Sequence, residues 1–256
     1  NSWHGSSVPN SSTALVEILT STNGVTLDQD VTVSKVTIFN GVTFTASDAN
    51  ARILTISKFS SGSEATLVNN GTWVNGTGGS TVVFTGSPNS GDAIHQISGN
   101  NAFQNITVNK TGGSSNVGAS FGANSSVSGT LKIGTGGYIS TAPPENFYGS
   151  AAILEFDQGS GADYVVNAAD YSWSTTEIPN NIKITSGTVT LNDTRSVNNN
   201  VTVDADATLT SSGNLTLSSD QNGTASLITK GTVTGNITVE RYLDDFPDKA
   251  PKWHYI

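Results

Sequence analysis

The sequence predicts an all-β protein built as a parallel β-helix, or β-solenoid, with almost no α-helix. The first observation is a short unit in which apolar and polar residues alternate, the period expected for a strand with one buried face. Four copies stand close together: NIKI at 181–184, TVTL at 188–191, NVTV at 200–203 and NLTL at 214–217. The second is that Gly, Asn, Asp and Ser separate the copies, and these residues favour turns. The third is a composition with 27 Gly, many Ser and Thr, and few helix formers.

The same unit recurs along most of the chain, from Gly24 to Val239. Its intervals of roughly 12 to 25 residues, with two or three strands each, suit the coils of a solenoid. About ten coils spaced ~4.8 Å apart would make a rod on the order of 50 Å long. An antiparallel sandwich or barrel also has short alternating strands and remains the alternative. The solenoid is favoured because the copies share the same turn residues at their starts.

The chain divides into five parts by regularity. We predict an N-terminal cap and first strand at 1–23, solenoid coils at 24–142, an irregular aromatic insertion at 143–179, further coils at 180–243, and an exit segment at 244–256 that leads toward a further module. Pro is denser in the insertion and strand alternation is weaker. Trp3 is expected to cover the open end of the stack, with ligand stacking as the alternative.

Alternation also predicts which side chains face the interior. The positions assigned inward are Ile53, Ile56, Leu67, Trp73, Val82, Phe84, Ile97, Phe103, Ile106 and Val108. Val, Ile, Leu and Phe should stack in columns inside the coils, while Thr and Asn form columns outside.

Charge and composition restrict the partners. The formal net charge is -9, and the 11 Lys and Arg residues are scattered singly, so we expect no nucleic-acid binding, which needs a concentrated basic stripe. No apolar run approaches the ~18 residues of a membrane-spanning helix, so no membrane insertion is expected. With no Cys, the chain has neither disulfides nor thiolate metal sites. Because the chain starts Asn1-Ser2-Trp3, we expect an extracellular or cell-surface protein after signal-peptide removal.

Several segments resemble the large secreted, adhesin-like surface proteins of type IX-secreting bacteria. These segments are NSWHGSSVPNSSTALVEI at 1–18, AFQNITVNKTGG at 102–113, ILEFDQGSGADYVV at 153–166, IPNNIKITSGTVTL at 178–191, and GNITVERYL at 235–243 with the final WHYI. The resemblance covers most of the chain as a loose coil pattern. It implies a right-handed parallel β-helix that is exported to the cell surface or medium, often within a longer polypeptide. It brings no catalytic residues.

Two kinds of binding site are suggested by residue types. Tyr148, Tyr164, Tyr171 and Trp173 could form a glycan-stacking platform, since flat rings match the apolar faces of pyranoses; the alternative is that Trp173 and its neighbours cap an enlarged coil. Calcium is the one cofactor that the sequence suggests, and it could be held by the acidic pairs Asp28/Asp30, Asp204/Asp206 and Asp244/Asp245. The alternative is that these aspartates form ordinary turns.

Catalytic patterns are weak. The stretch 118–122 (GASFG) fits G-x-S-x-G, but no helix follows, and we expect a Gly/Ser-rich turn there. His4, His95 and His254 lack ligand spacing and are expected to be exposed or capping. A polysaccharide lyase or hydrolase would use a basic residue near clustered acids, and Arg52, Lys58, Lys110 and Lys132 have no evident acidic partners. Outward Thr columns also suggest ice binding, although the coils are too irregular to present the flat, regular Thr lattice that this would need.

Taken together, the residues favour a non-enzymatic extracellular rod with a structural or adhesive role. Its expected partners are other modules of the same polypeptide and further copies of itself, end to end or side by side. A glycan-binding module that uses the 143–179 passage and a polysaccharide-degrading β-helix are the alternatives.

Overall fold

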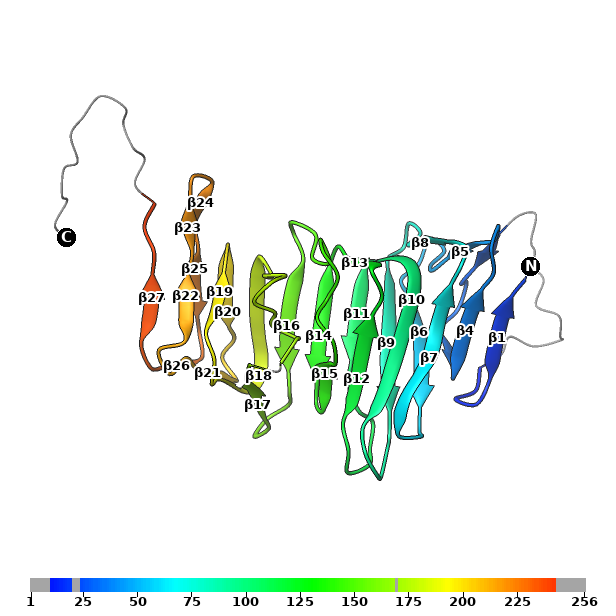
Figure 1. Cartoon of the computed structure of the whole chain (residues 1–256), viewed down its shortest axis with the longest axis horizontal. Helices are drawn as coiled ribbons and strands as arrows, with labels where there is room; N and C mark the ends of the chain where they lie inside the picture. Colours follow the sequence, from blue (N-terminus) through cyan, green and yellow to red (C-terminus); the bar gives the residue numbers. More distant parts are fainter. Residues whose placement is uncertain (1–9, 20–23, 169, 243–256) are drawn as a thin grey trace.

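The structure, a computed structural model, describes residues 10–19, 24–168 and 170–242 (Figure 1). Within these residues the protein is all-β and contains no helix. Parallel strands stack as a β-solenoid of about 9 turns, as the sequence predicts. The antiparallel alternative is wrong: among the described strands, the hairpin of β23 (Ser219–Asp220) and β24 (Gly223–Thr224) is the only antiparallel pair.

Each coil contributes strands to three faces. One face, which we call the long face, is a continuous parallel ladder. Its strands are β3 (Val31–Val33), β6 (Arg52–Lys58), β9 (Ser80–Gly86), β11 (Asn105–Val108), β14 (Thr130–Gly134), β16 (Ile153–Asp157), the first part of β18 (Asn181–Leu191), β20 (Asn200–Val203) and β25 (Ser226–Thr229). Every coil from β3 to β25 is therefore joined to the next by backbone hydrogen bonds.

A second face, the split face, is made of two separate ladders. The first contains β1 (Leu15–Ile18), β4 (Lys35–Ile38), β7 (Gly62–Asn69), β10 (Ala93–Phe103), β12 (Val117–Phe121) and β15 (Gly137–Ile139). The second contains β17 (Asp163–Val166), the last part of β18, β21 (Ala207–Thr210) and β26 (Thr232–Thr234). The two ladders are interrupted between β15 and β17.

The third face consists of short strands at the remaining corner of most coils, and the end of β10 joins it by pairing with β13. These strands are β2 (Val25–Thr26), β5 (Thr43–Thr45), β8 (Thr72–Val74), β13 (Asn124–Val127), β19 (Arg195–Val197), β22 (Leu215–Leu217) and β27 (Ile237–Val239). Coil length varies: the paired residues Ile182 and Val201 are 19 positions apart, whereas Leu54 and Val82 are 28 apart. Most extra residues of long coils lie at the corners, and the ladders shift register only within the β7–β10 and β16–β18 pairs among the described strands.

The interior is a stack of side chains that share one position in successive coils. A column with 0% exposure runs through Val33, Ile56, Phe84, Val108, Ile133, Phe156, Ile184 and Val203. Burying one such side chain contributes about 1.5–3 kcal/mol. Each coil buries its apolar face only against its neighbours, so stability accumulates along the rod.

The predicted inward positions are confirmed with one exception. Nine of the ten are buried, but Ile53 is 42% exposed and Leu54 is buried in its place. Ile53 and Ile56 are three positions apart, and a regular strand directs residues an odd number apart to opposite faces. Ile56 lies in the interior column, so Ile53 must face solvent.

The 143–179 passage contributes β16 and β17 to the stack and is irregular outside these two strands. β16 pairs with β14 and with β18 as a normal rung of the long face. A single parallel bridge joins Val127 to Tyr148 on the third face. The largest side chains of the passage, Phe147, Phe156 and Trp173, are fully buried. The aromatic residues therefore fill the interior of these coils.

Candidate functional site

The most organised polar feature is a charged column on the outer side of the long face. Parallel register places Lys132 beside Glu155 and Glu155 beside Lys183 in three successive strands. Neighbouring strands lie ~4.8 Å apart, so long side chains at these positions reach one another. Charge alternates along the rod axis, and the column joins β14, β16 and β18.

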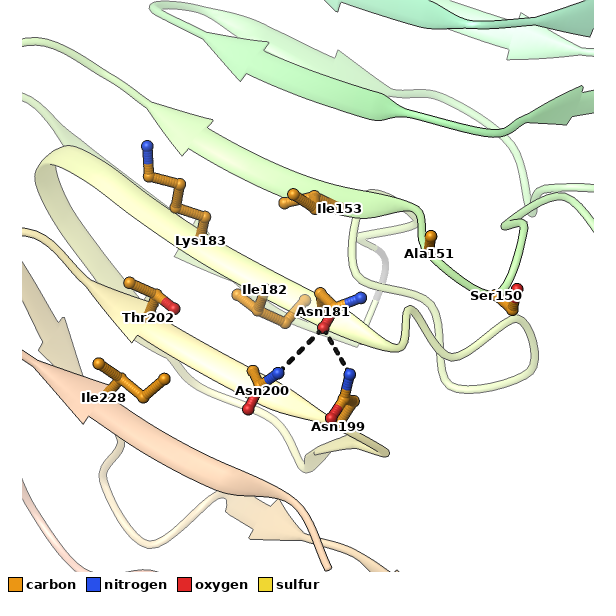
Figure 2. A pocket seen from close by; sticks show the side chains of 10 residues that line it. All are labelled: Ser150, Ala151, Ile153, Asn181, Ile182, Lys183, Asn199, Asn200, Thr202 and Ile228. Carbon is orange, nitrogen blue, oxygen red and sulfur yellow. Dashed lines mark hydrogen bonds between the residues drawn. The ribbon is translucent and has the colours of Figure 1, made fainter. Parts of the chain in front are cut away.

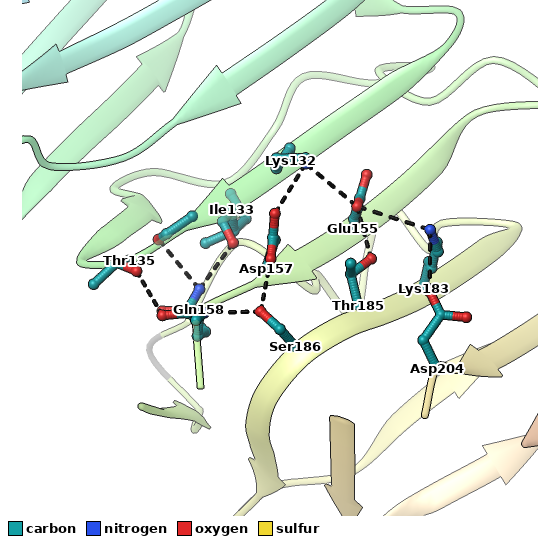
Figure 3. A network of polar contacts seen from close by, with 12 residues as sticks. Lys132, Ile133, Thr135, Glu155, Asp157, Gln158, Lys183, Thr185, Ser186 and Asp204 are labelled. Carbon is teal, nitrogen blue, oxygen red and sulfur yellow. Dashed lines mark hydrogen bonds and ion pairs between the residues drawn. The ribbon is translucent and has the colours of Figure 1, made fainter. Parts of the chain in front are cut away.

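Five side chains form the polar ladder shown in Figure 3. Lys132 Nζ lies 3.0 Å from Asp157 Oδ2 and 3.4 Å from Glu155 Oε1. Lys183 Nζ lies 3.2 Å from Asp204 Oδ2 and 4.0 Å from Glu155 Oε1. Glu155 is thus shared between two lysines, and the ladder extends from β14 to the residue that follows β20.

Hydroxyl groups fix the carboxylates of this ladder. Thr185 Oγ1 donates to Glu155 Oε1 at 2.7 Å, and Ser186 Oγ donates to Asp157 Oδ1 at 2.7 Å. The hydrogen bond from Ser186, with a further one from Lys132, lowers the pKa of Asp157 despite partial burial. Both carboxylates therefore accept hydrogen bonds from the next coil as well as from lysine.

Lys132 joins neighbouring coils as a charged group. Burial acts to lower the pKa of Lys132, but the hydrogen bond to Asp157 and the charges of both carboxylates outweigh it, and the net pKa is raised. Lys132 is therefore charged at neutral pH, which suits its ion pairs with Asp157 and Glu155.

An open hollow of about 520 Å³ lies on the long face beside the ladder (Figure 2). Asn181 Oδ1 accepts from Asn199 Nδ2 at 3.0 Å and from Asn200 Nδ2 at 3.4 Å, so three amides from neighbouring coils form one cluster. Ile153 and the half-exposed Ile228 supply the apolar part of the lining. The hollow combines amides with aliphatic groups and contains no aromatic ring in its described lining.

The four predicted glycan-binding aromatics do not form a platform. Trp173 is 0% exposed, and its Nε1 donates to the Ser196 carbonyl at 3.0 Å, so it cannot offer a ring face to a sugar. Tyr148 packs against Phe147 with ring centroids 5.1 Å apart.

The hydroxyls of Tyr148 and Tyr164 meet at Ser172: Tyr148 donates to the Ser172 carbonyl oxygen at 3.0 Å, and the Tyr164 hydroxyl lies 2.8 Å from Ser172 Oγ. The Tyr164 ring packs against Phe156 with centroids 5.0 Å apart, whereas Tyr171 is 37% exposed. Buried rings are expected when an enlarged coil must be filled, and that structural interpretation fits Trp173.

The aspartates proposed for calcium have other partners or stand apart. Asp30 Oδ1 accepts from the Ile53 amide at 2.9 Å, and Asp28 is exposed. Asp204 pairs with Lys183, while Asp206 is exposed. No group of three or more His, Cys, Asp or Glu able to hold a metal is present among the described residues. Calcium at Asp204 would have to displace Lys183; Asp244 and Asp245 lie outside the described residues.

Two further sequence predictions are wrong. The GASFG stretch is not a turn, because Gly118 to Phe121 lie within strand β12 and Ser120 Oγ is 2.8 Å from Thr141 Oγ1. His95 is not exposed: its Nδ1 is 3.0 Å from Thr66 Oγ1, and its Nε2 is 3.0 Å from the Thr85 carbonyl oxygen. Burial lowers the pKa of His95 to about 4.

Some residues lie outside the part of the chain that the structure describes. Trp3, His4 and His254 are among them, so the end-covering role expected for Trp3 stays a prediction.

Sequence reasoning missed the acidic partners of Lys132. Asp157, which hydrogen-bonds Lys132, is 25 positions away along the chain. The signal that could have found it is the repeat itself, because aligning the alternating units at 130–134 and 153–157 places Lys132 opposite Glu155.

In the described residues no helix is both long and apolar enough to cross a membrane.

Comparison with known proteins finds no relative. The chain matches no protein-family model, no curated protein and no solved structure.

Proposed function

We propose that this chain is a non-enzymatic extracellular rod that spaces or projects other modules of the same polypeptide. The observation that carries this proposal is the long face, where one parallel ladder joins every coil from β3 to β25. A filled interior column runs beneath this ladder. Bending such a rod would separate backbone hydrogen bonds on one side and open a void inside.

The polar ladder strengthens the rod where its second face is weakest. The contacts of Lys132 and Lys183 span β14 to β20 on the long face. The interruption of the split face, between β15 and β17, lies within the same coils. Individual surface ion pairs contribute only about 0–1 kcal/mol, but a shared network that crosses several coils acts against their separation.

An adhesive role would require the rod to associate with further copies of itself. The last described coil leaves β25, β26 and β27 with no following strand among the described residues. Ile228 and Val239 are exposed on these strands. Unpaired strand edges with exposed apolar residues are templates for pairing with another chain. Light scattering over a concentration series tests this version, and a monomer at every concentration would exclude it.

Rigidity can be measured directly, because the chain has no Cys and accepts two introduced labels without interference. Thr32 and Thr202 lie on the outer side of β3 and β20, near opposite ends of the long face. Spin labels on Thr32→Cys and Thr202→Cys should give one narrow distance distribution near the rod length between them, roughly 34 Å for seven ~4.8 Å steps. A broad distribution would contradict a stiff rod, and degradation of polyuronides by the purified protein would contradict a non-enzymatic role.

A further inference from the structure

The interruption of the split face leaves a depression between two coils, which we call the gap. In chain order β17 holds the place in its coil that β15 holds in the coil before, yet the two strands do not pair. On the long face the strands of the same coils, β14 and β16, do pair. The two coils therefore part on one side only, and a depression of about 390 Å³ lies there.

One wall of the gap is a tyrosine ring fixed in place. Tyr138 in β15 pairs with Gly118 in β12, and a Cβ at position 118 would lie 2.7 Å from Tyr138 Cζ. The Tyr138 hydroxyl donates to Asp92 Oδ2 at 2.9 Å, and Asp92 Oδ1 accepts from the Asn116 amide at 2.9 Å. The missing side chain of Gly118 thus provides the slot in which the ring lies, and Asp92 holds its end.

The opposite wall and the base carry carboxylates. Asp163, at the start of β17, is exposed and lines the gap together with Asp170. Asp170 Oδ1 accepts from the Ser172 amide at 2.7 Å and from the Tyr164 hydroxyl at 3.3 Å. Asp170 Oδ2 is buried and has no hydrogen-bond partner. Burial raises the pKa of Asp170 above its ordinary value.

Ser172 forms part of the base of the gap. At one point its side chain takes the place of the strand that is missing beside β15. Its Oγ accepts from the Ile139 amide at 3.0 Å and lies 2.8 Å from the Tyr164 hydroxyl. The gap is therefore built by specific contacts that hold β15 and β17 apart. A buried acceptor left without a donor, such as Asp170 Oδ2, favours a ligand that brings a hydroxyl or amide hydrogen.

We propose that the gap binds a neutral sugar, one or two pyranose units of a glycan, stacked on Tyr138 with hydroxyls donating to Asp163 and Asp170. A fixed aromatic ring offers a flat apolar surface at little conformational cost. Carboxylate oxygens accept hydrogen bonds from sugar hydroxyls. No Lys or Arg is found among the described residues that line the gap, so acidic sugars and phosphates are disfavoured. The volume is within the usual range of small-ligand sites.

The test uses a panel of neutral methyl glycosides and short oligosaccharides of glucose, mannose, galactose and xylose, with oligogalacturonate as an acidic comparison. Saturation-transfer NMR should detect binding of at least one member, and calorimetric titration should give its affinity. Tyr138→Ala should weaken that affinity about tenfold or more. Gly118→Ala should do the same, because it keeps every lining side chain but its Cβ displaces the Tyr138 ring.

Two carboxylate variants provide the matched comparison. Asp163→Asn should weaken binding about tenfold, because it replaces one acceptor oxygen of an exposed carboxylate with an amide donor. Asp206→Asn changes an exposed carboxylate outside the gap and should leave affinity unchanged.

Three results would overturn the proposal. They are no binding of any panel member at millimolar concentration, binding that survives both Tyr138→Ala and Gly118→Ala, or binding of oligogalacturonate alone. Unfolding curves of each variant separate lost binding from lost folding. The proposed rod role does not depend on this pocket, because label distances measure stiffness and the titrations measure sugar binding.

Discussion

The long face and the split face are made by the same coils but differ in continuity. The long face keeps every pairing from β3 to β25, whereas the split face breaks between β15 and β17. The comparison teaches that one continuous ladder is enough to hold the stacking of a solenoid. The other faces are then free to open, and an opening is where a ligand can enter an otherwise filled rod.

The interruption lies within the aromatic passage. Phe156 lies in the regular interior column, and its ring packs against Tyr164 at 5.0 Å and lies 6.4 Å from Trp173. Aromatic rings fill the paired coils as well, where Phe84 lies 6.4 Å from Phe103 and 6.1 Å from Phe121, so large rings alone do not open the split face. Beside β15, the Ser172 hydroxyl accepts from the Ile139 amide, a contact that a paired strand would otherwise make.

The largest expected effect comes from removing rings of the interior column on either side of this boundary. Phe84→Ala and Phe156→Ala both delete a fully buried ring, for which losses of about 3–5 kcal/mol are usual. Phe84 lies among fully paired coils, so its cavity should stay open and its cost should be near the upper value. Phe156 packs against Tyr164, which borders the gap and has open space beside it, so the cavity should partly close and the cost should be near the lower value. Urea unfolding of both variants measures the difference.

The control for these variants is Ile53→Ala, which shortens an exposed side chain of the same face and should change stability by less than about 0.5 kcal/mol. Equal losses for Phe84→Ala and Phe156→Ala would show that the wall of the gap is as rigid as a paired face.

Lowering the pH should reduce folding stability by a smaller amount, through a residue in the intact part of the split face. His95 in β10 has a pKa lowered to about 4, chiefly by burial. The fold therefore disfavours the protonated ring. Stability should be complete above the ordinary pKa of about 6.5, fall as pH drops toward 4 because only the unfolded chain gains the proton, and then level off. The total loss should be at most about 3 kcal/mol.

The measurement is urea unfolding between pH 7.5 and about 4, with His95→Gln as the comparison. The variant should be less stable at neutral pH but should lose most of the slope between pH 6.5 and 4. Lys58 and Glu64 are the charged groups that act on His95, and both are retained in the variant. An unchanged slope would assign the pH dependence to other groups, such as the two remaining histidines.

The sequence predicted those parts of the structure that depend on local alternation. Strand positions and nearly all inward residues follow from the period of two, and Ile53 was misplaced because two apolar residues stand side by side at 53 and 54. The polar ladder was missed because its partners meet only through the register of coils whose lengths vary.

The gap was missed for a related reason. Gly118 suggested a turn or a nucleophile elbow, whereas its role in the structure is to make room for the Tyr138 ring of the next coil. A contact between coils leaves no pattern within either strand, so residue types alone do not show it.

The smallest effect considered is loss of the shared carboxylate on the long face. Glu155→Gln removes the negative charge between Lys132 and Lys183, leaves the side-chain shape nearly unchanged, and keeps an acceptor for Thr185. Partly exposed ion pairs contribute about 0–1 kcal/mol each, so a loss of about 1 kcal/mol is expected at low salt. The loss should shrink at 1 M salt, where the screening length is about 3 Å.

Glu145→Gln is the matched control, because Glu145 is exposed in the same part of the chain and lies outside the ladder. It should change stability little at either salt concentration. If Glu155→Gln behaves like this control, the lysines must be held by Asp157 and Asp204 alone, and the long face owes its continuity to backbone pairing and interior packing. If the loss is present and salt-sensitive, the ladder contributes to joining β14, β16 and β18 where the opposite face is open.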